Sequence, residues 1–344
     1  MKQRIIAIIS LNFALPLLFG GFCAYAEAEV AKSAGEITPS ITYIDVIGDK
    51  EKFAEDHWIK KGVTGGIGEY SYINENKHGD SIVAEGRALA GNGDYFFNCD
   101  LKKEGFGNFV FEFKQFKKYY DGTGGFFSLF TPTAAVPKLD FETERDLSLN
   151  IGNFKVEGIF SKDENTKCSV SYEREYRKGA KSLVSWGPVT GNGYTEYILP
   201  TFLEVDEMTD KLDMKIEHTV NGIDVSAEQT WERVNSQIQK VNNRTLTLST
   251  GLFTNTRIKY EELISDMYTT TVRASKELNE RAFFSTAFLY SHYHGHTTET
   301  VTDTSTSAYN ENNPNNPANV RQDVVTVLPK VSISLSEHLL MDAG

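Results

Sequence analysis

The sequence predicts an all-β fold in which about twelve antiparallel strands form an up-and-down transmembrane β-barrel. Three observations support this fold class: an export signal, alternation of apolar with polar residues, and connections that are alternately short and long. No later segment approaches the roughly 18 apolar residues that a membrane-spanning helix needs. A membrane crossing would therefore use β-strands, which bury only alternate residues.

The N-terminus has the three parts of a secretory signal peptide. Lys2 and Arg4 precede an apolar stretch, and the small residues of Ala24-Tyr25-Ala26 form a cleavage site. We therefore assign residues 1–26 to the signal peptide and residues 27–344 to one outer-membrane β-barrel domain. The predicted location of the mature chain is the cell outer membrane.

The mature chain is acidic and carries two cysteines. Without Lys2 and Arg4, the mature chain has 33 basic and 47 acidic residues, which gives a net charge of −14. This negative charge argues against nucleic acid as a partner. Cys99 and Cys168 fit the pattern of small apolar strand residues, and a disulfide between them stays open. Because no Cys-x-x-Cys-His motif occurs, the chain attaches no c-type haem of its own.

The clearest element is a β-hairpin over residues 212–231. Two alternating stretches flank Asn221-Gly222, a dipeptide that supplies the positive φ of a two-residue turn. The alternation predicts that the apolar residues share one face. They are Met214, Ile216, Val220, Ile223, Val225 and Trp231.

Five further stretches show the same alternation. They are rich in β-branched and aromatic residues and lack the 3.6-residue period of a helix. These predicted strands contain Tyr95–Leu101, Phe109–Phe113, Val170–Tyr176, Ala282–Tyr290 and Val331–Leu335.

The connection lengths favour a barrel over a soluble sandwich, because outer-membrane barrels have short turns at one rim and long loops at the other. Short connections are predicted at residues 74–80, 104–108, 161–167, 221–222 and 278–280. Long loops are predicted at residues 48–62, 118–146, 178–211, 234–262 and 292–322. The two kinds alternate, except for a short link at residues 92–94.

The parity of apolar residues changes at Gly152-Asn153, which resembles a two-residue turn. A turn there would move the loop after Lys178 to the wrong rim. We therefore predict a β-bulge inside one strand over residues 147–160.

The C-terminal residues 339–344 predict the start of one more strand after a short turn. A barrel must close, because an open edge in lipid leaves backbone groups unpaired. We therefore expect the barrel domain to be incomplete at its C-terminus.

Several segments resemble one family of outer-membrane proteins. The most distinctive is the run Lys118-Tyr119-Tyr120-Asp121-Gly122-Thr123-Gly124-Gly125, and others are Tyr43–Asp49, Lys181–Trp186 and Phe202–Glu207. They resemble the N-terminal part of the porin component of porin-cytochrome electron conduits, the MtrB/PioB type of decahaem-associated outer-membrane β-barrels.

The resemblance implies a non-enzymatic scaffold that sheaths a multihaem c-type cytochrome for extracellular electron transfer across the outer membrane. The haem would be carried by this periplasmic or outer-surface partner, not by the chain itself. Candidate lumen- and partner-facing residues are Asp213, Lys215, Glu217, Asp224, Glu228 and Glu232. The same residues suit a water-filled pore, so a general or solute-specific diffusion porin is the alternative function.

A third hypothesis is a surface enzyme or adhesin that acts through the long loops, and no nucleophile elbow or metal-hydrolase motif supports it. His292, His294 and His296 alternate, so an extended backbone would put them on one face as a weak candidate metal site. A solvated loop is the simpler interpretation of these histidines. Tyr119-Tyr120 and Phe126-Phe127 are interpreted as an aromatic girdle at the membrane rim, with an inward-folded loop as the alternative.

Overall fold

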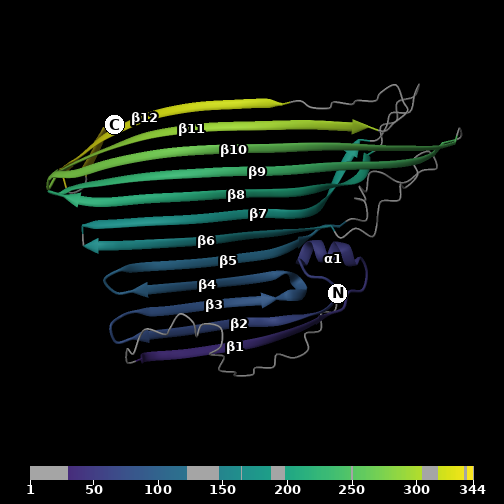
Figure 1. Ribbon diagram of the computed structural model, residues 1–344, viewed down its shortest axis with the longest axis horizontal. Coiled ribbons are helices and arrows are strands. Elements are labelled where there is room, and N and C mark those ends of the chain that lie inside the picture. The colour runs from purple at the N-terminus through teal and green to yellow at the C-terminus, as the bar shows by residue number, and fades with distance from the viewer. Residues whose placement is uncertain are drawn as a thin grey trace.

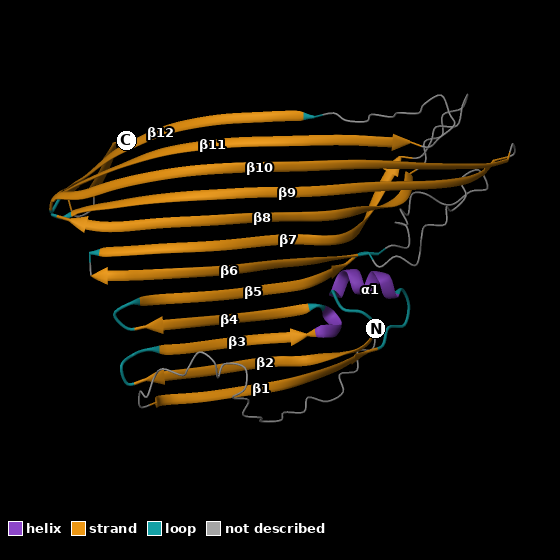
Figure 2. Ribbon diagram, viewed as in Figure 1, coloured by secondary structure: helices purple, strands orange, loops and turns teal. Residues whose placement is uncertain are grey.

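The computed structural model describes residues 30–121, 147–163, 165–186, 198–248, 251–303, 317–336 and 339–343. These residues form one sheet of thirteen strands, in which each strand pairs with its neighbours along the sequence (Figure 1). All twelve pairings are antiparallel. The predicted all-β, up-and-down fold is confirmed (Figure 2). The predicted signal peptide lies outside the described residues.

The strands differ greatly in length, from 5 residues in β13 to 29 in β10. Their bounds are β1 Val30–Ile44, β2 Gly62–Asn76, β3 Ser81–Leu89, β4 Asp94–Lys103, β5 Gly107–Tyr119, β6 Ser148–Asp163, β7 Thr166–Trp186, β8 Ile198–Val220, β9 Ile223–Leu248, β10 Gly251–Asn279, β11 Ala282–Asp303, β12 Ala318–Ser336 and β13 Leu339–Ala343. Two short helices, α1 Lys50–His57 and η1 Ala90–Asn92, complete the described elements.

The hairpin between β8 and β9 confirms the prediction made for residues 212–231. Val220 pairs with Ile223, and Asn221 and Gly222 adopt φ of 53° and 71° between them. Both turn residues therefore have the positive φ that a type I′ turn requires. Asn and Gly at these positions allow the tight turn without steric strain.

One face of the sheet is apolar, and we call it the apolar face. Directly paired residues share a face, so the register places side chains from β4 to β12 together. Its members include Leu101, Phe109, Val170, Met214, Ile216, Ala227, Val272, Phe288 and Val327. The opposite surface, which we call the polar face, carries the charged residues that alternate with them.

Exposure of the two faces is the reverse of that in a soluble sheet. Met214 and Ile216 on the apolar face are 45% and 47% exposed, whereas Ser265 and Thr271 on the polar face are 6% and 8% exposed. The polar face is the more crowded of the two, as expected for the inner side of a curved sheet. A contiguous exposed apolar surface marks a contact with a membrane or another protein.

The short turns are staggered regularly from one hairpin to the next. Ala84, Phe111, Tyr172, Trp231 and His292 lie on one cross-strand row. They stand 3, 4, 6, 8 and 10 residues, respectively, from Ser81, Gly107, Thr166, Ile223 and Ala282, the first residues of their strands. This stagger of roughly one residue per strand, with a rise of ~3.3 Å and a strand spacing of ~4.8 Å, corresponds to a strand tilt of about 35°. A tilt of this size is typical of barrel walls.

The predictions of long loops at residues 178–211, 234–262 and 292–322 are wrong for much of their length. β7 continues to Trp186, β9 and β10 continue to Leu248 and from Gly251, and β11 continues to Asp303. These extensions pair with one another, so their backbone groups are satisfied within the sheet. Sequence alternation could not reveal them, because both faces of the extensions are rich in polar residues.

The predicted bulge at Gly152-Asn153 is also wrong. β6 is one strand, as expected, but its pairing with β5 runs from Phe160 to Ser148 without a register shift. The parity changes because Leu149 and Ile151 lie on the polar face, where Ile151 pairs with Phe116. The sequence changes its apolar side while the backbone stays regular.

The predicted loop at residues 48–62 contains helix α1. Asp49 caps the helix by accepting a hydrogen bond from the backbone N–H of Lys52 at 2.9 Å, and Trp58 ends it with a left-handed φ of 57°. Phe53 is 3% exposed and packs with Ile44 and Val46. The helix lies at the rim that is opposite the short turns (Figure 1).

Within the described residues, β1 and β13 form the two ends of the sheet, which is not closed. The predicted start of a strand after residue 338 is confirmed by β13. No helix in the described part of the chain has the length and apolar character to cross a membrane.

Asp80 joins two neighbouring short turns. Its carboxylate accepts hydrogen bonds from the backbone N–H of Glu104 at 2.9 Å and from the side chain of Asn76 at 3.0 Å. These donors hold the pKa of Asp80 below its usual value of 3.8. A lowered folded-state pKa means that the bridge stabilises the turns at neutral pH and is lost as the pH falls through that pKa, below 3.8.

We expect Asp80→Ala to weaken protection of the Glu104 amide against hydrogen exchange at pH 7, because its carboxylate acceptor is removed. In the unmodified chain the protection should fall only below pH 3.8, after correction for intrinsic exchange rates. Asp100→Ala, a carboxylate truncation on β4 away from this turn, serves as the control. Equal protection in Asp80→Ala and the unmodified chain at pH 7 would contradict the bridge.

Candidate functional site

The six residues predicted to face the lumen lie together on the polar face. Asp213, Lys215 and Glu217 alternate along β8, and Lys215 pairs directly with Glu228 on β9. Asp224 and Glu232 share the parity of Glu228, so they occupy the same face. The structure thus brings all six residues onto one surface of the sheet.

Five of the six residues make polar contacts with neighbouring side chains. Lys215 Nζ lies 2.6 Å from Glu217, and the hydroxyls of Thr230 and Thr219 donate at 2.6 Å to Asp213 and Asp224. Glu228 lies 3.6 Å from Arg273 on β10. These five side chains are therefore oriented by neighbours on their own and adjacent strands.

The register adds a row of alternating charge that sequence spacing did not reveal. Glu112, Lys155, Glu173, Lys211 and Glu232 are successive cross-strand partners from β5 to β9. Opposite charges that face each other across strands stabilise a sheet. Only the pairing of distant segments creates this row, since its members are spread over more than a hundred residues of sequence.

A hollow of about 530 Å³ lies on the polar face, between this row and the rim that is opposite the short turns. Its lining includes Lys114, Phe116, Ile151, Glu175, Arg177, Glu207 and Leu263. The ring of Trp58, which follows α1, stacks on Phe116 with centroids 5.3 Å apart. Helix α1 is therefore anchored beside the upper part of the polar face.

The described part of the family-like motif, residues 118–121, lies beside α1 and Trp58. Lys118 Nζ lies 5.9 Å from the ring centroid of Trp58 and 5.5 Å from that of Tyr120. Tyr120 donates its backbone N–H to Leu147 at 2.9 Å and packs against the cluster of Leu147, Ala180 and Phe202. Asp121 ends the described part, and Gly122, Gly124 and Gly125 lie outside the described residues.

The girdle interpretation is wrong for Tyr119, which is only 4% exposed. Lys60 lies over its ring at 5.0 Å, which shields it from the surface. Phe126 and Phe127 lie outside the described residues.

A different set of aromatic residues forms a belt on the apolar face. Each member lies 8 to 11 residues from the short-turn end of its strand, so the belt follows the tilt of the sheet. The belt consists of Tyr95, Tyr176, Trp231, Tyr268 and Tyr290. This spacing of 8 to 11 residues is close to the ~9 to 11 residues of one tilted membrane crossing.

Charged residues appear on the apolar face at and above the aromatic belt. Asp210, which is 9% exposed, accepts hydrogen bonds at 2.6 Å from both Arg174 and the Tyr172 hydroxyl. Arg233 and Asp266 continue the same cross-strand row. The apolar part of this face therefore ends at a boundary of paired charges.

The three histidines lie on strand β11 and not in a loop. They share the apolar face, where His292 Nδ1 lies 2.7 Å from Asp323 and His296 Nδ1 lies 2.7 Å from Asn319. The outer two, His292 and His296, are four residues apart on the strand, roughly 13 Å, which is too far for one metal ion to bind all three. Among the described residues, no group of three or more metal-ligating side chains has the geometry of a site.

Cys99 and Cys168 are both free and lie on the apolar face of β4 and β7. Their placement matches the prediction of small apolar strand residues.

No family model, curated protein or solved structure matches the chain.

Proposed function

We propose that the chain forms the wall of an outer-membrane β-barrel that sheaths a multihaem c-type cytochrome for electron transfer. The observation that carries the membrane part is the exposed apolar face, bounded by short turns and by the aromatic belt. Its height, 8 to 11 residues per strand, matches the apolar band of outer-membrane barrels. The charged polar face opposite it would line the lumen.

The number of strands favours a lumen that holds a macromolecule or water. Eight-stranded barrels fill their interior with their own side chains, whereas barrels of about 16 strands leave an open channel. The thirteen strands described are already well beyond the first class. Together with the resemblance to porin-cytochrome conduits, this width supports a sheath around a soluble, haem-bearing partner.

A diffusion porin is the second candidate, because a lining of paired charges also suits hydrated ions. The two functions differ in what the native barrel contains. A sheath should be purified from its host with a haem protein, and it should conduct ions only after that partner is removed. A diffusion porin should contain no haem and conduct ions at once.

The test is mild detergent extraction from the native host, haem staining of the purified complex, and conductance in planar bilayers. We expect a protein with covalently bound haem to comigrate with the barrel. This haem protein should dissociate from the barrel at high salt, because a charged lumen binds its partner electrostatically. Haem-free barrels that conduct without treatment would overturn the sheath and favour the porin. Adding a purified multihaem cytochrome to such barrels would then form no complex.

A further inference from the structure

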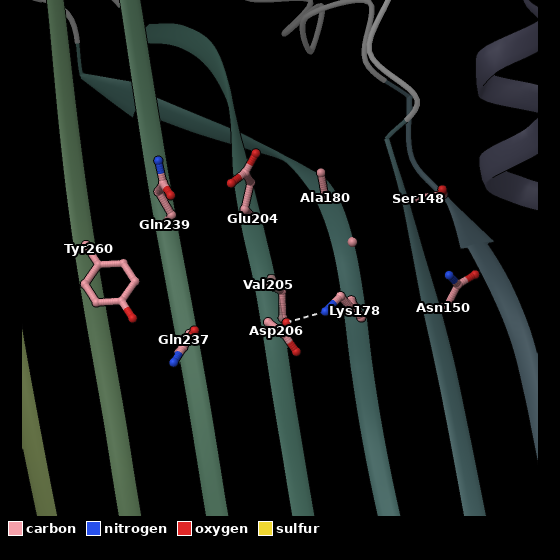
Figure 3. A pocket seen from close by; sticks show the side chains of 11 residues that line it. Ser148, Asn150, Lys178, Ala180, Glu204, Val205, Asp206, Gln237, Gln239 and Tyr260 are labelled. Carbon is pink, nitrogen blue, oxygen red and sulfur yellow. Dashed lines mark hydrogen bonds and ion pairs between the residues drawn. The ribbon is translucent and has the colours of Figure 1, made fainter.

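The apolar face carries a second hollow, of about 470 Å³, far above the aromatic belt. Figure 3 shows its side chains projecting from five neighbouring strands, β6 to β10. The lining includes amides, carboxylates and one aromatic ring: Asn150, Glu204, Asp206, Gln237, Gln239 and Tyr260. Lys178 forms an ion pair with Asp206 at 2.6 Å in the middle of the hollow.

Small residues shape one end of this hollow. Gly179 has a φ of +144°, and a Cβ there would lie 2.1 Å from the backbone oxygen of Ser148. Ala180 and Ser148 beside it are also small, so β6 and β7 approach closely and leave space above them. Tyr260 and Gln239, which are cross-strand partners, form the opposite end.

The height of the hollow decides which molecules can reach it. Gln237 and Gln239 lie 6 and 8 residues beyond Trp231 along β9, which is about 15–20 Å above the belt for a strand tilted by about 35°. The polar layer of an ordinary phospholipid bilayer extends only about 5–8 Å beyond the hydrocarbon on each side. An ordinary phospholipid headgroup is therefore too short to fill the hollow.

We propose that this hollow binds the oligosaccharide of a glycolipid that surrounds the barrel in the outer leaflet. The proposal rests on the proposed membrane orientation, with the long-loop rim outside. The hollow continues the apolar face, so the lipid whose acyl chains contact Met214 or Val272 carries its polar part past the belt toward it. Only a lipid with a long sugar headgroup spans that distance.

The chemistry of the lining suits sugar hydroxyls. Asn and Gln side chains offer a donor and an acceptor each, and carboxylates accept from hydroxyl groups. The ring of Tyr260 presents an apolar surface for the C–H groups of a sugar ring and a hydroxyl at its edge. Two adjacent cross-strand rows supply these groups, one through Asp206 and Gln237 and the other through Glu204 and Gln239.

The test measures binding of lipopolysaccharide with a complete core oligosaccharide to the detergent-purified barrel. Tyr260→Ala/Gln239→Ala removes one cross-strand pair of the hollow. The matched control, Tyr293→Ala/Gln322→Ala, removes a cross-strand pair of the same residue types on the polar face. We expect at least tenfold weaker binding in the first variant and unchanged binding in the control.

Two further probes distinguish the source of the sugar. Lipid A without core sugars should bind both variants equally, and free core oligosaccharide should bind more weakly than the intact glycolipid. The proposal is overturned if the Tyr260→Ala/Gln239→Ala variant binds intact glycolipid normally, or if free oligosaccharide binds as tightly as the lipid. Neither result depends on a cytochrome, so failure here is separate from failure of the sheath.

Discussion

Arginine in place of Ala227 should destabilise the folded chain in lipid vesicles by about 2–4 kcal/mol, the cost of a cation at the bilayer midplane on a barrel's outer surface. Ala227 lies on the apolar face, four residues from Ile223 at the turn and four from Trp231 in the belt. It therefore stands midway across the proposed hydrocarbon layer. Denaturant titration of the vesicle-inserted protein gives the free energy of unfolding directly.

Ser226→Arg provides the control at the same depth on the opposite face. Ser226 is half-buried on the polar face and pairs with Glu217, so an arginine there meets water and a carboxylate. We expect its effect to be within about 1 kcal/mol of the unmodified chain. Equal losses in both variants, or no loss in either, would show that the apolar face does not contact lipid.

The second large effect concerns the row of alternating charge on the polar face. Lys155→Glu/Lys211→Glu makes the row uniformly acidic from Glu112 to Glu232. Each of four attractive cross-strand neighbours becomes repulsive, and at up to about 1 kcal/mol each the unfolding free energy should fall by roughly 2–4 kcal/mol. Salt at about 1 M should recover most of this loss, since exposed charges are then screened.

An inverted row serves as the control for this prediction. Adding Glu112→Lys, Glu173→Lys and Glu232→Lys to the double variant restores alternation with every sign reversed. Stability should return toward that of the unmodified chain, because the cross-strand attraction depends on alternation and not on which strand carries which charge. A five-residue variant that stays as unstable as the double variant would assign the loss to the ion pairs along the strands, Lys155 with Glu157 and Lys211 with Asp213.

The sequence was informative wherever one face of a strand is apolar. The hairpin at Asn221-Gly222, its apolar side and its polar side were all predictable, because a two-residue turn and a period of two fix the register. The six lumen candidates follow from the same parity. Cys99 and Cys168 were placed on the apolar face by the same argument.

The same reasoning failed where both faces are polar or where parity is broken. The extensions of β9 and β10 beyond the belt have no apolar alternation, so they looked like loops although they pair with each other. Leu149 and Ile151 reversed parity because they lie on the polar face near α1. Tyr119 was interpreted as part of a girdle, yet it is buried beneath Lys60.

Alternation of residues along the chain is enough to predict a series of antiparallel amphipathic strands with one apolar and one polar side. That information is local, since it needs only the alternation of side chains along each strand. The stagger of the turns, the aromatic belt, the charge row from Glu112 to Glu232 and the hollow beside Tyr260 arise from the pairing of the strands. Each of these depends on cross-strand register, which joins residues that are far apart in the sequence.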